Sequence, residues 1–206
     1  MQLTAVQTDA LGELGNIGAA HAATTLSQML MSQIEMDVPA VSIVDISQFY
    51  SVIDDQCGAL VVFQITGETH GQGYVVLYMP QKSAVCLTNT MLGMNDMDRE
   101  INDMDQSALI EVGNIMVSAF LDATAELLGI VMLPSPPSLC VDMAHAGIQS
   151  ILAEVAQETD EVVIFRTNLH TGQNEIEGTL LLFPDQTLLA DLVKLLESLT
   201  SPNRSS

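Results

Sequence analysis

Two short stretches decide the organisation of this chain: ALGELGNIGAA at residues 10–20 and ALIEVGNIMVS at residues 108–118. Among the identities that recur between them at a constant offset of 98 residues are Glu13, Gly15, Asn16 and Ile17 in the first and Glu111, Gly113, Asn114 and Ile115 in the second. Identities that recur at one spacing indicate an internal repeat. We therefore expect two related halves, at about residues 7–93 and 105–200, within one domain that spans residues 1–206.

Each stretch lies inside a long amphipathic helical pattern. The first pattern runs from about residue 8 to 31, with Thr8 or Asp9 as a suitable N-cap, and the second from about residue 105 to 128. Their apolar stripes consist of Leu11, Leu14, Gly18, Ala22 and Met29 in the first helix and Val112, Met116, Phe120 and Leu127 in the second. The sequence thus predicts two long helices with one apolar face each.

The segment after each helix is rich in strand-forming residues. In the first half, a break at Pro39 precedes strands expected at 40–46, 58–65 and 73–78 and a helix expected at 81–91. In the second half, strands are expected at 138–141, 161–169 and 176–183, with an extra helix at about 144–157 and a last helix after Pro184. Since neither half buries its hairpin easily alone, we expect an α+β fold with pseudo-two-fold symmetry: a six-stranded, largely antiparallel sheet and two long helices packed side by side.

The charge and hydropathy of the chain exclude several classes of function. Five Lys and Arg stand against 26 Asp and Glu, a formal net charge of -21 that repels nucleic acid and anionic lipid surfaces. No uninterrupted apolar run approaches the roughly 18 residues of a membrane span, and the N-terminus has no basic segment followed by an apolar core. The expected location is the cytoplasm.

A carboxylate and a carboxamide point outward together on each predicted helix. At about 100° per residue, one arc of each helix, opposite the apolar stripe, collects Asp9, Glu13, Asn16 and Ala20 on the first and Ser107, Glu111, Asn114 and Ser118 on the second. One such arc is typical of an ordinary solvated face, and duplication alone could preserve the identities. Gly15 and Gly113 could serve close helix–helix packing instead of chemistry.

The spacing of these residues resembles a known signature. Asp9-x3-Glu13-x2-Asn16-x22-Pro39 and Ser107-x3-Glu111-x2-Asn114-x22-Pro137 are similar to the paired motif of the CheC, CheX and FliY phosphatases of bacterial chemotaxis. The double copy resembles CheC more than the single-motif CheX, and no long appended domain of the FliY kind is seen. The two prolines are interpreted as structural, because a locked φ fixes how the chain enters the next strand.

The resemblance implies an aspartyl-phosphate phosphatase acting on a CheY-like response regulator. Glu13 and Glu111 would pair with the active-site lysine of the regulator, and Asn16 and Asn114 would orient the water for in-line attack. Asp9 and Ser107, on the same arcs, are candidate contacts to the regulator. Mg²⁺ is expected in the regulator, and no cofactor is expected in this chain. This division suits the chemistry, because phosphoryl transfer depends on positioning and charge stabilisation.

Other readings of the chain stay open at this point. The amphipathic stretch HAGIQSILAEV at residues 145–155 matches in position the helix through which CheC-like proteins bind the receptor deamidase CheD, with Gln149 as a candidate substrate mimic. A non-catalytic adaptor for CheD or a response regulator is therefore an alternative, and a flagellar-switch component is a third. His21, His70, His145 and His170 have no metal-ligand spacing, so no metal site is predicted.

Overall fold

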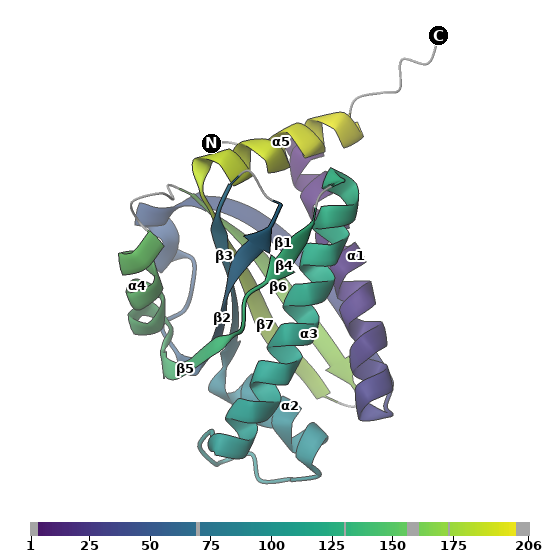
Figure 1. The fold of residues 1–206 in the computed structure, drawn as a ribbon. Helices are drawn as coiled ribbons and strands as arrows, with labels where there is room; N and C mark the ends of the chain where they lie inside the picture. Colours follow the sequence, from purple (N-terminus) through teal and green to yellow (C-terminus); the bar gives the residue numbers. More distant parts are fainter. Residues whose placement is uncertain (1–3, 69–70, 130, 156–160, 173, 201–206) are drawn as a thin grey trace.

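The computed structural model describes residues 4–68, 71–129, 131–155, 161–172 and 174–200. The first half comprises α1 (Ala5–Leu30), β1 (Ile34–Asp45), the 3-10 helix η1 (Ile46–Ser51), β2 (Cys57–Gly67), β3 (Gly73–Pro80) and α2 (Gln81–Leu92). The second comprises α3 (Asp103–Leu128), β4 (Met132–Pro134), β5 (Ser138–Met143), α4 (Ala144–Val155), β6 (Glu161–Thr171), β7 (Asn174–Pro184) and α5 (Gln186–Thr200). The order repeats (Figure 1), and η1 stands where the second half has α4.

The strands form one seven-stranded sheet in the order β1-β6-β7-β3-β2, with both β4 and β5 beyond β2. Every pairing is antiparallel. The predicted α+β class, antiparallel sheet and paired long helices are therefore confirmed. The strand beyond the expected six is β4, whose three residues pair with the end of β2.

The two halves exchange strands across the sheet. At the centre, Val76 of β3 pairs with Leu181 of β7, and these residues correspond in GYVVLYMPQ at residues 73–81 and GTLLLFPDQ at residues 178–186. Outward from this pair, β1 of the first half pairs with β6 of the second, and β5 of the second pairs with β2 of the first. Each half therefore completes the sheet of the other.

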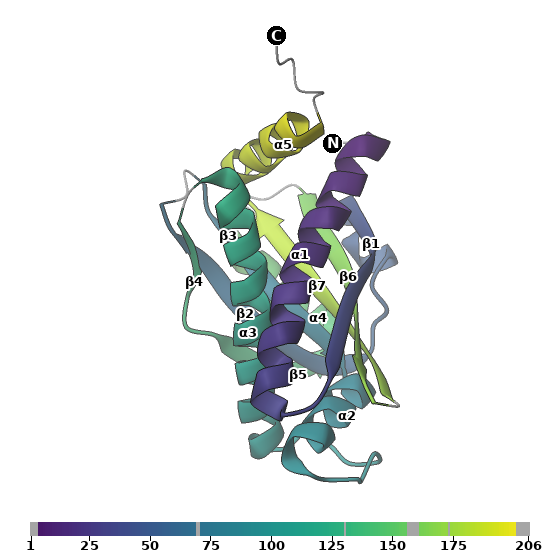
Figure 2. The ribbon, with the colours of Figure 1, turned by 90° about the vertical axis from the view of Figure 1, so that its right-hand side faces the viewer.

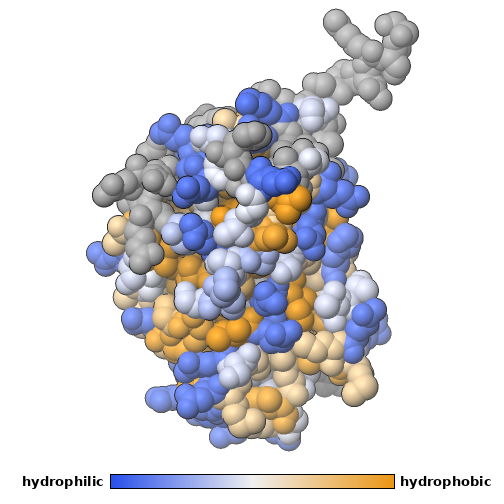
Figure 3. Space-filling view, viewed as in Figure 1, coloured by the Kyte–Doolittle hydropathy of each residue, from blue (hydrophilic) through white to orange (hydrophobic). Residues whose placement is uncertain are grey.

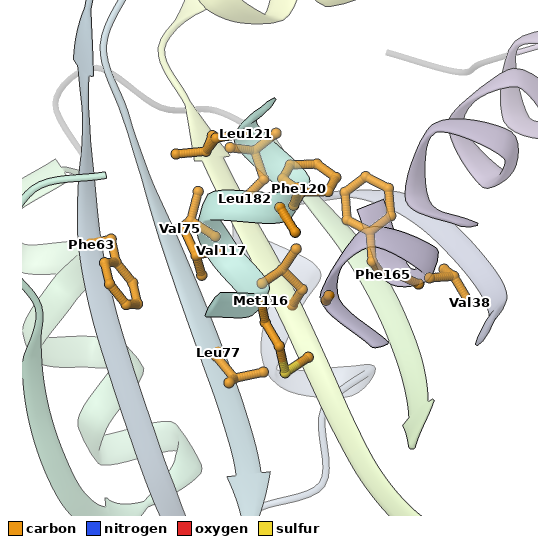
Figure 4. Packing of buried hydrophobic residues seen from close by; sticks show 14 of the residues in the cluster. Val38, Phe63, Val75, Leu77, Met116, Val117, Phe120, Leu121, Phe165 and Leu182 are labelled. Atoms are coloured by element: carbon orange, nitrogen blue, oxygen red, sulfur yellow. The ribbon is translucent and has the colours of Figure 1, made fainter. Parts of the chain in front are cut away.

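Helices cover both faces of the sheet. Helices α1 and α3 lie side by side on one face (Figures 1 and 2) and bury a core in which the rings of Phe120 and Phe165 meet edge to face at 4.9 Å (Figure 4). The opposite face buries a second cluster, in which Phe49 of η1 and Ile148 of α4 pack on strand residues such as Leu60. Helices α2 and α5 lie at opposite ends of the molecule (Figure 1).

Several boundaries differ from the sequence predictions. Helix α1 is capped by Thr4 and not by Thr8 or Asp9, because Thr4 and Gln7 form a capping box. Strand β1 begins at Ile34 and continues through Pro39, where a register shift lets the strand tolerate a missing N–H. The apolar stripes are buried as predicted except at Met29, which is 37% exposed near the helix end, and Leu127, whose side chain lies outside the described part.

A buried ion pair fixes the connection between the halves. The carboxylate of Asp105, in the first turn of α3, is fully buried and accepts hydrogen bonds from the guanidinium of Arg99. Arg99 also donates to Thr88 and Asn89 of α2. The hydrogen bonds from Arg99 are the main reason that the pKa of Asp105 falls from 3.8 to about 2. The connection thus ties α2 to the start of the helix that carries Glu111 and Asn114.

Helix α3 is apolar because it is a core helix. By length and composition alone, its segment Asp103–Glu126 could cross a membrane, although polar residues interrupt its apolar runs. Two thirds of its most apolar window, 67%, is buried inside the fold. Packing against α1 and the sheet therefore accounts for this composition.

Candidate functional site

The two Glu/Asn pairs project from the outer surfaces of α1 and α3. Glu13 and Asn16 on α1 and Glu111 and Asn114 on α3 are all exposed. Asp9 and Ser107, one turn earlier on each helix, are exposed as well. The outward orientation agrees with the sequence prediction, and neither carboxylate of the motif lies in an enclosed pocket. Such a surface can meet another protein, whereas a small substrate would find no enclosing walls.

The glycine before each Asn sets the height of the helix above the sheet. A Cβ atom at Gly15 would lie 3.1 Å from Phe165 Cδ1, and one at Gly113 would lie 3.0 Å from Val61 Cγ1. A third glycine allows a close contact between the two helices, since a Cβ at Gly18 would lie 3.0 Å from the Cα of Phe120. Close helix–helix packing was therefore the wrong interpretation of Gly15 and Gly113, because both glycines let their helices approach the sheet.

The Asn16 side chain is held by the backbone of the strand that follows its helix. The amide N–H of Val38 donates to Asn16 Oδ1 at 2.9 Å. Val38 precedes Pro39 in the irregular part of β1, where the register shifts between Asp37 and Ala40. In the first half, this bond joins the motif Asn to the residue that precedes the motif proline.

The Asn114 side chain has different surroundings. It borders a groove of about 450 Å³ between the two long helices, lined by His21, Thr24 and Thr25 of α1 and by Ser118 and Asp122 of α3, among others. Within the described residues, no hydrogen bond to its carboxamide is found. Sequence reasoning missed His21 as a neighbour of this site, because that proximity depends on how the two helices cross.

The remaining candidate, Gln149, lies on a different surface. It is exposed on α4, which packs on the sheet face opposite α1 and α3. Apolar surface reaches solvent nearby along β5, where Val141 and Met143 are 37% and 40% exposed (Figure 3). The fold therefore does not bring Gln149 together with the Glu/Asn pairs, and any partner of α4 would bind elsewhere.

Metal-binding geometry is not found in the described ranges. No group of three or more His, Cys, Asp or Glu side chains there could hold a metal ion. His145 instead bonds to the Ile53 carbonyl at 2.8 Å through Nε2, and its backbone N–H donates to Asp55 at 3.0 Å. His170 lies 3.4 Å from Asp37, and His70 falls outside the described residues. The fourth histidine, His21, lies on α1 and lines the groove beside Asn114.

Comparisons with known proteins agree with this arrangement. The CheC-like family model matches residues 6–43 and 104–141, which contain one motif each. CheC of Bacillus subtilis, a CheY-P phosphatase, is 30% identical over 186 residues, covering 87% of this chain and 88% of that protein. The structure of Thermotoga maritima FliY has a TM-score of 0.78 at 24% identity, covering 96% and 99% of the two chains. A Helicobacter pylori FliM, in complex with SpeE, has a TM-score of 0.70 at 14% identity, covering 96% and 97%. The fold is thus shared with FliY and FliM, and the identity to CheC over most of both proteins shows that this chain belongs to the CheC-like family of chemotaxis proteins.

Proposed function

We propose that this chain is a phosphatase that hydrolyses the aspartyl phosphate of a CheY-like response regulator. The observation that carries the proposal is the exposure of two Glu/Asn pairs on adjacent helices, each backed by a glycine that seats its helix on the sheet. The identity to a CheY-P phosphatase supports the same reaction. A non-enclosed site suits a substrate that arrives as the folded surface of another protein.

The chemistry divides between the two proteins. Hydrolysis of an aspartyl phosphate needs a water in line with the leaving carboxylate and positively charged groups beside the negative equatorial oxygens. A carboxamide can accept a hydrogen bond from that water and donate one, so Asn16 and Asn114 are assigned to position it. Glu13 and Glu111 are assigned to pair with the lysine of the regulator. Mg²⁺ and that lysine supply the charge from the regulator, and this chain needs no cofactor of its own.

The decisive experiment measures the decay of a CheY-like regulator labelled with acetyl phosphate, with Mg²⁺ present. Wild type should accelerate the decay, and the double variant Asn16→Ala/Asn114→Ala should lose the acceleration while still binding the regulator. The matched control is Asn95→Ala, an exposed residue of the α2–α3 connection that should leave the rate unchanged. In Glu13→Gln/Glu111→Gln we expect weaker binding of the regulator, seen as a raised KM.

The alternative is an adaptor that binds without turnover. The observation that favours a second binding surface is the separation of α4 and the apolar β5 edge from the motif helices. An adaptor would tolerate both Asn-to-Ala substitutions. If α4 binds CheD, Gln149→Ala should weaken that complex, as measured by calorimetry, without changing the rate of dephosphorylation.

A further inference from the structure

The two halves treat their motif Asn residues differently, and one backbone N–H is the cause. Val38 and Pro39 together face a single residue of β6, Thr167, because the pairing jumps from Asp37–Asn168 to Ala40–Arg166. The N–H of Val38 therefore lies in the irregular part of the ladder. It donates to Asn16 Oδ1 at 2.9 Å, and Val38 itself is 7% exposed. This bond satisfies a donor that would otherwise be buried without a partner.

The second half cannot form the same bond. At the offset of 98 residues that relates Glu13 to Glu111, the residue equivalent to Val38 is Pro136, which has no backbone N–H. The sequence reads Val38-Pro39 in one half and Pro136-Pro137 in the other. This agrees with the described structure, where Asn114 borders the groove between α1 and α3 and no bond holds its carboxamide.

We propose that the two sites are unequal, with Asn114 supplying most of the turnover and the Val38 N–H acting as a positioning group that restrains Asn16. This inference rests on the proposed function. To turn toward a docked phosphoryl group, Asn16 must release Val38 and leave its N–H unpaired, whereas Asn114 has no such bond to break. The difference of one ordinary intramolecular hydrogen bond corresponds to about threefold to tenfold in the population of the free carboxamide.

The groove gives the Asn114 site a second distinguishing feature. His21, Thr24 and Thr25 reach it from α1, so one wall of this site belongs to the other half of the chain. The equivalent of His21 is Ala119, at the same offset. A segment of the regulator that enters beside Asn114 would therefore meet polar side chains from both long helices.

The test compares single-site enzymes in the acetyl-phosphate decay assay. Asn114→Ala should remove most of the rate, and Asn16→Ala should remove a minor part. In the Asn114→Ala background, Val38→Pro copies the Pro-Pro sequence of the second half and removes the donor to Asn16 together with the buried Val38 side chain. We expect it to raise the remaining kcat about threefold to tenfold with little change in KM, because the carboxamide is released while the docking surface stays the same.

Two results would overturn the inference. One is an equal loss of rate in Asn16→Ala and Asn114→Ala. The other is a fall in kcat for a folded Val38→Pro variant, because it would mean that the bond holds Asn16 in a productive orientation. The single variants decide the matter even if Val38→Pro does not fold. The bond itself has a readout without turnover, since hydrogen exchange at the Val38 amide should accelerate in Asn16→Ala. A wild type inactive on every regulator tested would refute the proposed function, whereas an active one with equal sites would refute only this inference.

Discussion

Replacing Asp105 by Asn should destabilise the protein in a pH-dependent way. The Asp105 carboxylate is fully buried, and hydrogen bonds from Arg99 and from the Asn102 N–H lower its pKa from 3.8 to about 2. A lowered pKa means that folding favours the ionised form, so the contribution is complete above about pH 4 and is lost as the pH falls through 2. At 1.36 kcal/mol per pKa unit, the shift corresponds to roughly 2 kcal/mol of folding free energy at pH 7.

Urea unfolding of wild type and Asp105→Asn, followed by circular dichroism at pH 7 and at low pH, measures this contribution. The free energy of unfolding of Asp105→Asn should be about 2 kcal/mol below that of wild type at pH 7, and this difference should shrink as the pH approaches 2. Asp98→Asn, an exposed carboxylate in the same connection, is the matched control and should stay within about 0.5 kcal/mol of wild type. A gap of the same size at both pH values would refute the electrostatic account and leave only a packing effect.

Two further predictions concern the helix that carries Asn16. Gly15→Ala should lower the free energy of unfolding by about 1 to 3 kcal/mol, because its Cβ would lie 3.1 Å from the buried ring of Phe165. Gly12→Ala should raise it by about 0.5 to 1 kcal/mol, because nothing lies within 4 Å of its Cβ. Thermal denaturation of both variants measures the difference. Met31 ends α1 at a φ of 47° and is 94% exposed. Met31→Gly should therefore stabilise the fold by about 1 kcal/mol in the same assay. A lower stability of this variant would show that the left-handed conformation of Met31 carries no strain.

The sequence was sufficient for the features that depend on identities and periodicity. Recurring identities located both halves, and the 3.6-residue pattern placed Glu13, Asn16, Glu111 and Asn114 outside, where the structure has them. It failed where a long-range contact decides the outcome. Pro39 suggested a break, yet β1 continues past it because the register shift leaves no ladder bond for that residue to lose. The capping of α1 by Thr4 depends on a local pair, Thr4 and Gln7, which apolar periodicity does not report.

The details of the site were out of reach for a related reason. Strand exchange places β1 against β6, so the bulge that frees the Val38 N–H is created by the opposite half of the chain. In the same way, His21 becomes a neighbour of Asn114 only because α1 and α3 pack together. Periodicity reports which face of one helix is polar, and it contains no information on what a second helix or strand brings to that face.

Because the fold is shared with proteins such as FliM at 14% identity, the architecture alone cannot determine an activity. Under the proposed function, the determining groups are a few side chains on two exposed helix faces. Each motif helix packs on a strand of the opposite half, through Gly15 on Phe165 and Gly113 on Val61. These contacts are buried and do not depend on the residues at the helix surface. A change as small as Val38 against Pro136 can then alter one site without disturbing the other. If both proposals hold, the duplicated fold maintains two docking faces, and local hydrogen bonds set the relative rates of the two sites.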